Sequence, residues 1–417
     1  MIPPFIHRHR RKIAAAVGVA AAGYYAFSFL KSKLEDWQAS LQSSITYKEN
    51  LRRRFEQNQK DSSFTVAALL SSLTDPIMKH LPVEEITREL QSKQRAQSGI
   101  LTDEMPVSDV VSVASSAVTD EGGCKVRSKK EMWDEIKIIS ITRAVSLIYA
   151  ISLLVFFTRL QLNLLGRKNY LDSVLSLSEE IDPVEEYDVK IADQEEKDII
   201  DNEVNRRFLT YSWWLLNNGW RKLVDTVKKA TADAFKDITP RSELTYSDLV
   251  SLFTTIRSSV TTQTTPFLDI LLPATREEEQ FVLSQNPAPE FSSTPRLERI
   301  LDPRINEVLD EAKDLIESPN AEQVMRCLLD EAFNLFLSNM RMAYFVTPKE
   351  GQEDDTIEDE KKVRLANLLA GISRQSHEMT VKSSQSNQYL VAMNETPELA
   401  MFSAVVYSNF GALGSLF

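Results

Sequence analysis

Apolar side chains recur along most of the chain at intervals of three and four residues, which is the spacing of an amphipathic helix. The first such segment after residue 33 has its apolar positions at Leu34, Trp37, Leu41, Ile45, Leu51 and Phe55. We interpret it as a helical stalk, followed by a shorter helix at 62–73 and by a third helix that Pro82 opens. Later helices are predicted at 205–237, 245–260, 305–316, 321–345 and 361–373. The pattern therefore favours an all-α fold.

Residues 13–30 form an uncharged apolar run near the start of the chain. Eighteen helical residues span about 27 Å, close to the hydrocarbon thickness of a bilayer. A cleaved signal peptide and an amphipathic or mitochondrial-type leader are the competing interpretations. Because Lys31 and Lys33 follow at once and the helical pattern continues beyond them, a retained transmembrane anchor is favoured.

Residues 129–175 are the most apolar part of the remaining chain, and 144–157 contain no charged residue. Arg143 and Arg159 bracket this run, and the interval between them is short for a membrane span. A buried helix with other helices packed all around it is favoured over a second transmembrane helix. The predicted architecture is an elongated bundle of long helices around this central apolar helix, preceded by one N-terminal transmembrane helix.

Several segments break the helical pattern and are predicted to be flexible loops. These segments are 96–128, 179–200, 284–303 and 349–360. The first is rich in Ser, Val, Asp and Gly, the second and fourth are acidic, and the third contains four prolines. The expected organisation of the chain is a basic leader at 1–12, an anchor at 13–30 and one helical domain at 31–417.

Charge is distributed unevenly along the 417 residues. The formal net charge is −12, and residues 1–33 hold six basic and no acidic residues, which leaves −18 on the rest. Phosphate binding needs a basic face, so this acidic body argues against a nucleic-acid partner. The triplet Arg52–Arg54 is interpreted as a solvated or acid-paired helix face. Contact with lipid headgroups is a weaker interpretation, because the stalk holds the triplet away from the bilayer.

Residue types that serve catalysis or metal binding are scarce. Only His80 and His377 lie outside the leader, and Cys124 and Cys327 lack metal-site spacing. No phosphate-binding, dinucleotide-binding, nucleophile-elbow or zinc-protease motif occurs. The carboxylates fall in acidic runs where nothing would raise the pKa of one member. We therefore expect no enzyme activity, no metal and no cofactor, and interpret the chain as a binding protein held on a membrane.

The charges around the anchor leave its orientation open. Four basic residues precede the span and two follow it, which by the positive-inside rule places the N-terminus in the cytosol and translocates the body. Two cysteines are too few for a disulfide framework and do not support translocation. One glycosylation sequon, at Asn394, is weak support for it.

Two segments of the chain resemble a known family. The segment RRRFEQNQKDSSFTVAALLSSL with the following LPVEEITRELQ, and the segment KKEMWDEIKIISITRAVSLIYAISLLVFFTRLQLNLLGRKNYLDS, resemble the peroxisomal biogenesis factor 3 family, also called peroxin-3. The resemblance is dense over 1–175 and continues more loosely through WWLLNNGWRKL to the end of the chain. The chain looks like a fungal-type member, although its serine-rich loop at 96–128 matches no part of the family pattern.

This resemblance implies a function that composition does not. Proteins of the family sit in the peroxisomal membrane by an N-terminal anchor, with transit through the ER as an option, and their helical body faces the cytosol. They dock the N-terminal amphipathic helix of peroxin-19, which delivers newly made peroxisomal membrane proteins for insertion. The N-terminus would then face the lumen, opposite to the charge count. Peroxisomal targeting would reside in Arg8, Arg10, Arg11 and Lys12, which otherwise only flank the span.

The family also implies a docking residue. A tryptophan at the start of the long central helix makes the contact with peroxin-19, and Trp133 is the matching position. Lys129, Ile136 and Lys137 lie three or four residues from it and share its helical face, so we expect an exposed aromatic contact with a lysine rim. Without the resemblance, Trp133 would be interpreted as a core residue.

Two alternative functions stay open at this point. Family members in fungi also recruit inheritance and autophagy factors, which would make the chain a membrane tether. An import receptor of the mitochondrial outer membrane would have a similar leader, but no reason for the Trp133 segment.

Overall fold

A computed structural model of the chain describes most of the helical domain. The described residues are 44–99, 127–179, 187–264, 266–286, 295–346, 361–383 and 386–409. The expected leader at 1–12 and anchor at 13–30 lie outside them, as do the expected loop at 349–360 and nearly all of the one at 96–128.

Helices make up nearly all of the described chain. Those of the first half are α3 (Ser44–His80), α4 (Val83–Gly99), α5 (Lys129–Glu179), α6 (Tyr187–Thr210), α7 (Ser212–Trp214), the π-helix η1 (Leu215–Gly219) and α8 (Trp220–Ala234). Those of the second half are α9 (Tyr246–Thr264), α10 (Leu268–Leu271), α11 (Arg276–Ser284), α12 (Pro295–Glu317), α13 (Pro319–Tyr344), α14 (Leu365–Met379), α15 (Gln388–Asn394) and α16 (Pro397–Ser408). The all-α prediction is confirmed.

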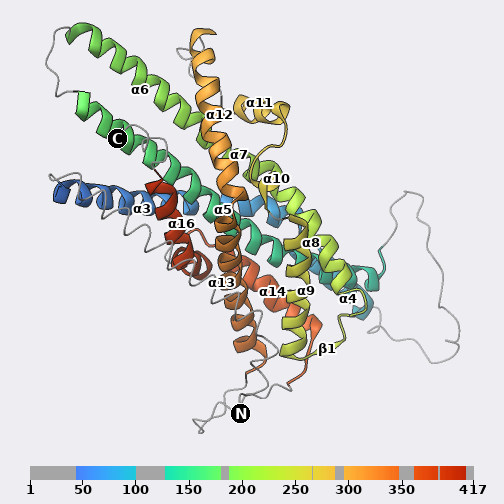
Figure 1. Cartoon of the computed structure of the whole chain (residues 1–417). Coiled ribbons are helices and arrows are strands. Elements are labelled where there is room, and N and C mark those ends of the chain that lie inside the picture. The colour runs from blue at the N-terminus through green and yellow to red at the C-terminus, as the bar shows by residue number, and fades with distance from the viewer. Residues whose placement is uncertain are drawn as a thin grey trace, which may run out of the picture.

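Helix α5 is the centre of the bundle, with α3, α8, α13, α14 and α16 packed around it (Figure 1). Within the described chain it is the helix long and apolar enough to cross a bilayer, but 94% of its most apolar window is buried inside the protein. Side chains such as Leu153 and Phe157 are almost fully buried, and each such side chain stabilises the fold by roughly 1.5–3 kcal/mol. The prediction of a buried central helix is confirmed.

Helix α3 runs antiparallel to α5 along most of its length. Near the start of α3, the Nη1 atom of Arg54 donates a hydrogen bond to Ser173 Oγ at 3.1 Å. Just beyond the other end of α3, the Leu81 carbonyl accepts a hydrogen bond from Arg143 at 3.4 Å. The N-terminus of α3 therefore lies beside the C-terminal part of α5. The apolar faces of the two helices are buried against each other in the same hydrophobic core.

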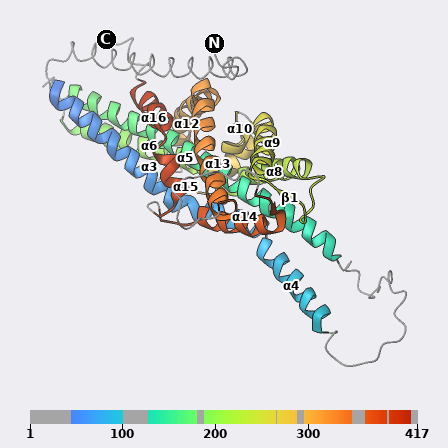
Figure 2. The same cartoon turned by 90° about the horizontal axis from the view of Figure 1, so that it is seen from below.

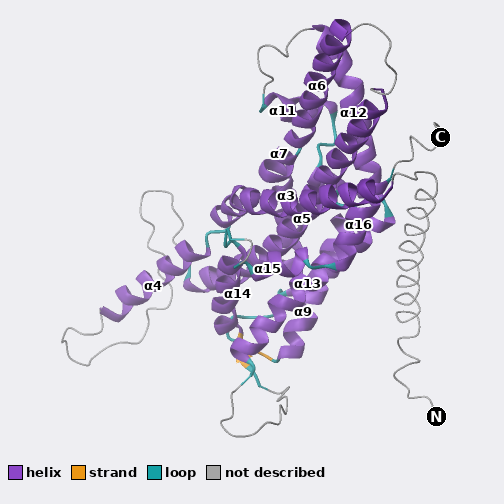
Figure 3. Ribbon diagram, turned by 90° about the vertical axis from the view of Figure 1, so that its left-hand side faces the viewer, coloured by secondary structure: helices purple, strands orange, loops and turns teal. Residues whose placement is uncertain are grey.

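The bundle is elongated, with different helices projecting at its two ends. Helix α4 extends from one end beside the start of α5 (Figure 2). At the other end α6 and α12 pack together, with α11 against α6 (Figure 3). Two short antiparallel strands, β1 (Glu243–Leu244) and β2 (Val363–Arg364), join the segment before α9 to the start of α14.

Some element boundaries differ from the sequence predictions. Helix α3 is continuous through Pro76, where two helices were expected. The acidic segment expected as a loop is helical from Tyr187 onward, and α12 begins at Pro295 and contains Pro303. Breakers and charge runs are local signals, and long-range helix packing outweighs them in each of these segments.

The predicted helix at 205–237 is instead divided by η1. A Cβ added to Gly219, at the end of η1, would lie 1.9 Å from the carbonyl oxygen of Ile270 in α10. The indole nitrogen of Trp214 also donates to the carbonyl oxygen of Asp269, at 3.2 Å. The close approach of α10 therefore coincides with the irregular turn and requires glycine at this position.

Candidate functional site

The start of α5 is fixed by a reciprocal cap. The Glu131 amide donates to Ser128 Oγ at 3.2 Å, and the Ser128 amide donates to Glu131 Oε2 at 2.9 Å. Arg127 forms an ion pair with Glu135 at 2.9 Å just outside this turn. The Ser-x-x-Glu spacing is a sequence signal for a capping box that the sequence predictions did not use. Helix α5 therefore begins at a defined residue, Lys129, about one turn before Trp133.

Trp133 lies half-buried on this first part of α5 and packs against the hydrophobic core. Its neighbour Met132 is fully buried, whereas Lys129 and Lys130 are exposed. Neither lysine forms an ion pair with any residue of the described ranges. An aromatic side chain with one covered and one open side, beside two free cations, can accept an apolar partner with anionic groups at its edge.

Two of the four residues expected on the docking face are buried. Ile136 and Lys137 are 4% and 5% exposed, so neither presents its side chain to solvent. The Lys137 ammonium donates to the carbonyl oxygens of Phe235 at 3.2 Å and Ile238 at 2.7 Å, just beyond the end of α8. The expectation of Lys137 as an exposed rim residue therefore has to be corrected. Helical spacing gives the direction of a side chain but not which neighbouring element covers it.

Lys93 of α4 connects α4 to the start of α5. Its ammonium forms an ion pair with Glu89 at 2.9 Å and donates to the Arg127 carbonyl oxygen at 3.4 Å. It also lies 3.7 Å from the sulfur of Met132. The first turn of α5 is therefore held from the α4 side as well as by its own cap.

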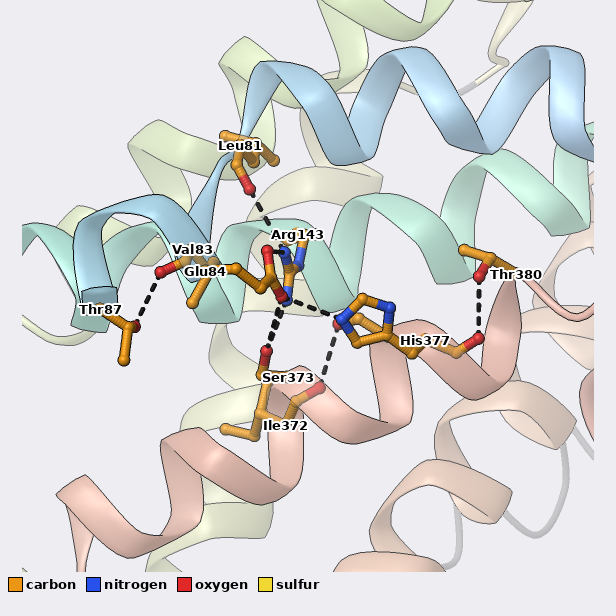
Figure 4. A network of polar contacts seen from close by, with 10 residues as sticks. Leu81, Val83, Glu84, Thr87, Arg143, Ile372, Ser373, His377 and Thr380 are labelled. Atoms are coloured by element: carbon orange, nitrogen blue, oxygen red, sulfur yellow. Dashed lines mark hydrogen bonds and ion pairs between the residues drawn. The ribbon is translucent and has the colours of Figure 1, made fainter. Parts of the chain in front are cut away.

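A buried arginine links α4, α5 and α14 further along the central helix (Figure 4). Arg143 is fully buried, and its two terminal nitrogens each donate to one carboxylate oxygen of Glu84 at 2.7 Å. Ser373 Oγ lies 2.5 Å from Arg143 Nη2, and His377 Nε2 lies 2.9 Å from Glu84 Oε1. This bidentate geometry is the strong form of a charge-assisted hydrogen bond.

The electrostatics of this network favour an ionised Glu84. Burial by itself would raise the pKa of Glu84, but the hydrogen bonds from Arg143 and the arginine charge outweigh it and bring the pKa to about 2. Glu84 also lies in the first turn of α4, where a negative charge is favoured by the helix dipole. The network therefore fixes α4 against the bundle and does not resemble a proton-transfer site.

The glycosylation sequon is poorly placed for modification. Asn394 is half-buried, accepts a hydrogen bond from Arg159 Nη2 at 2.9 Å and donates to the Leu390 carbonyl oxygen at 2.8 Å. Thr396 of the same sequon is 3% exposed. The sequon therefore does not support a translocated body.

Other candidate chemistry is limited in the described part of the chain. No group of three or more His, Cys, Asp or Glu side chains there is placed to hold a metal. Burial raises the pKa of the half-buried Cys327 thiol to about 11, which disfavours the reactive thiolate. The targeting candidates Arg8, Arg10, Arg11 and Lys12 lie outside the described residues.

The fold and site together define an all-helical protein whose candidate site is a half-exposed tryptophan on a capped central helix. A family model described as Peroxin-3 matches residues 4–409. Peroxisomal biogenesis factor 3 of Yarrowia lipolytica is 37% identical over 435 residues, which cover 97% of this chain and 99% of that protein. Peroxisomal membrane protein PEX3 of Komagataella phaffii is 29% identical, with 97% and 98% covered. Peroxisomal biogenesis factor 3 of Saccharomyces cerevisiae is 28% identical, with 98% and 97% covered.

The chain belongs to the peroxin-3 family. It is therefore a peroxisome biogenesis factor of the peroxisomal membrane. This membership excludes the interpretation of the chain as a mitochondrial import receptor. It confirms the family resemblance found in the sequence.

Proposed function

We propose that the chain is a docking receptor for peroxin-19 that enables the insertion of peroxisomal membrane proteins. The observation that carries this proposal is the half-exposed Trp133 on a capped, core-packed helix start. Interface hot spots are enriched in Trp, and an aromatic ring held by a rigid element loses little side-chain entropy on binding. The apolar face of an amphipathic helix is the partner that such a surface fits.

The rim of the proposed site carries two exposed lysines that form no ion pair within the described ranges, whereas the acids beside them are engaged. Glu131 accepts from the Ser128 amide, Glu135 pairs with Arg127 and Asp134 with Lys137. Lys129 and Lys130 are exposed beside Trp133, while the chain beyond residue 33 has a net charge of −18. A local positive rim favours acidic side chains on the polar face of the partner helix. Rim charges act mainly on the association rate and are screened by salt, so Lys129 and Lys130 are expected to have smaller, salt-sensitive effects.

Attachment and orientation are part of the same proposal. Residues 13–30 would form the anchor, the helical body would face the cytosol, and Arg8, Arg10, Arg11 and Lys12 would contribute to targeting. Protease treatment of intact organelles should digest the body, and a protected body would contradict this topology. Neutralising the four basic residues should misdirect a reporter fused to residues 1–45.

The decisive experiment measures binding of a peptide of the peroxin-19 N-terminal helix to the full chain in detergent micelles. Trp133→Ala should weaken binding by about 2 kcal/mol or more, which is roughly 30-fold. Trp213→Ala is the matched control, because Trp213 is also half-buried but packs edge-to-face on Phe281, with ring centroids 5.5 Å apart, in another part of the molecule. Circular dichroism melting checks the folding of both variants. Wild-type affinity in a folded Trp133→Ala variant would refute the proposal.

A further inference from the structure

Lys137 is the only lysine that is buried within the described ranges. Its ammonium lies 3.2 Å from the Phe235 carbonyl oxygen, 2.7 Å from the Ile238 carbonyl oxygen and 3.5 Å from Asp134 Oδ1. Of the three N–H donors of the ammonium group, two are used by the carbonyl oxygens, and Asp134 is at ion-pair distance. Lys137 is 5% exposed, so its proximity to Trp133 in the sequence does not make it a contact residue.

The two carbonyl groups belong to the turn that ends α8. Phe235 is the C-terminal cap of α8 and is fully buried, and the Ile238 amide donates to the Phe235 carbonyl at 3.3 Å. Carbonyl groups at a helix C-terminus lack intrahelical partners and carry the negative end of the helix dipole. A cation placed there donates hydrogen bonds to the free carbonyl groups and interacts favourably with the helix dipole. Lys137 therefore joins the end of α8 to the beginning of α5.

This junction lies next to the candidate docking residue. Trp133 and Lys137 are four residues apart on α5, so their side chains project on the same side, one turn apart. Ile238 and Trp133 are both partly buried and pack against the same hydrophobic core. Because Lys137 contacts the turn 235–238 and lies one helical turn from Trp133, the turn lies close to the candidate docking surface on the side of Lys137.

We propose that Lys137 is a positioning residue for partner docking. It holds the turn 235–238 against the first part of α5, so that the surface beside Trp133 is already formed when the partner helix arrives. It acts on affinity through this geometry and not through contact with the partner. The inference rests on the proposed docking function and adds the element that pre-organises the site.

The test compares Lys137→Met with Lys137→Arg in the full chain in detergent micelles. The matched control is Lys236→Met, because Lys236 is exposed in the same turn and forms no ion pair within the described ranges. Binding of the peroxin-19 helix peptide is measured at two salt concentrations, and amide hydrogen exchange is followed at residues 235–238. If Lys137→Met does not fold, Lys137→Gln replaces it, since the amide keeps donor groups without the charge.

The Lys137→Met variant should bind the peptide about tenfold more weakly, because the hydrogen bonds from the charged Lys137 ammonium to the turn 235–238 are lost. The Ile238 amide should exchange faster, the salt dependence of binding should stay as in the wild type, and Lys137→Arg should recover most of the affinity. Wild-type affinity in Lys137→Met, or a reduced salt dependence with unchanged exchange, would overturn the inference. Failure of the docking proposal can be distinguished from failure of this inference, because it would show as unchanged peptide binding in the Trp133→Ala variant.

Discussion

The pairing of Glu84 with a fully buried arginine gives the sharpest prediction about stability. Glu84→Gln removes the carboxylate that accepts two hydrogen bonds from Arg143 at 2.7 Å each, while the guanidinium stays charged inside the protein. Removing one partner of a buried ion pair costs about 3–5 kcal/mol. The Glu84 side chain is 44% exposed, so water can replace part of the interaction and we expect a loss of about 2 kcal/mol.

The loss of stability should be confined to α4 and α14, which the network joins to α5. Amide hydrogen exchange of the full chain should show α4 and the neighbouring part of α14 opening about 30-fold more often in Glu84→Gln. Glu89→Gln is the matched control on the same helix, because Glu89 pairs with Lys93 at an exposed position, and it should change exchange little. Arg143→Met combined with Glu84→Gln should recover part of the loss, since no uncompensated charge remains. Equal exchange in the Glu84 and Glu89 variants would refute this reasoning.

Three further predictions follow from individual groups. The lowered pKa of Glu84, about 2, means that its stabilising effect is complete above the ordinary pKa and is lost as the pH falls from about 4.5 toward 2. The protection factors of the α4 amides, which are corrected for the intrinsic pH dependence of exchange, should fall over that window in the wild type but not in Glu84→Gln. Gly219→Ala should destabilise the fold by more than about 3 kcal/mol by thermal melting, because its Cβ meets a backbone oxygen. Gly371→Ala, whose Cβ meets the movable Tyr344 side chain, should cost less. Cys327 should react with iodoacetamide at pH 7 more slowly than an ordinary exposed thiol, because burial raises its pKa to about 11, and a normal rate would contradict this.

Much of the fold could be predicted from local patterns. The uncharged run 144–157 indicated a helix buried on all sides, and α5 is such a helix. The boundaries were less predictable, since Pro76 and Pro303 lie inside helices and the acidic segment from Tyr187 is helical. A proline inside a helix costs about 3 kcal/mol or more, and packing along a long neighbouring helix can exceed that cost.

The candidate site could also be predicted only in part from the sequence. The resemblance to the family indicated Trp133, and the Ser128–Glu131 spacing held an unused signal for the start of its helix. Nothing in the segment around Trp133 indicated the burial of Lys137, because its partners, Phe235 and Ile238, are about a hundred residues away in the chain.

The sequence by itself determined the helical class, the acidic body with its basic leader, the family and the central apolar helix. Those properties depend on residue type and on spacing within one segment, which are local quantities. Only the tertiary structure decided which side of the first turns of α5 is covered, that Lys129 is exposed while Lys137 is buried, and that Glu84, Arg143 and Ser373 meet. These are contacts between distant segments, and a side chain's burial is set by the elements that pack against it.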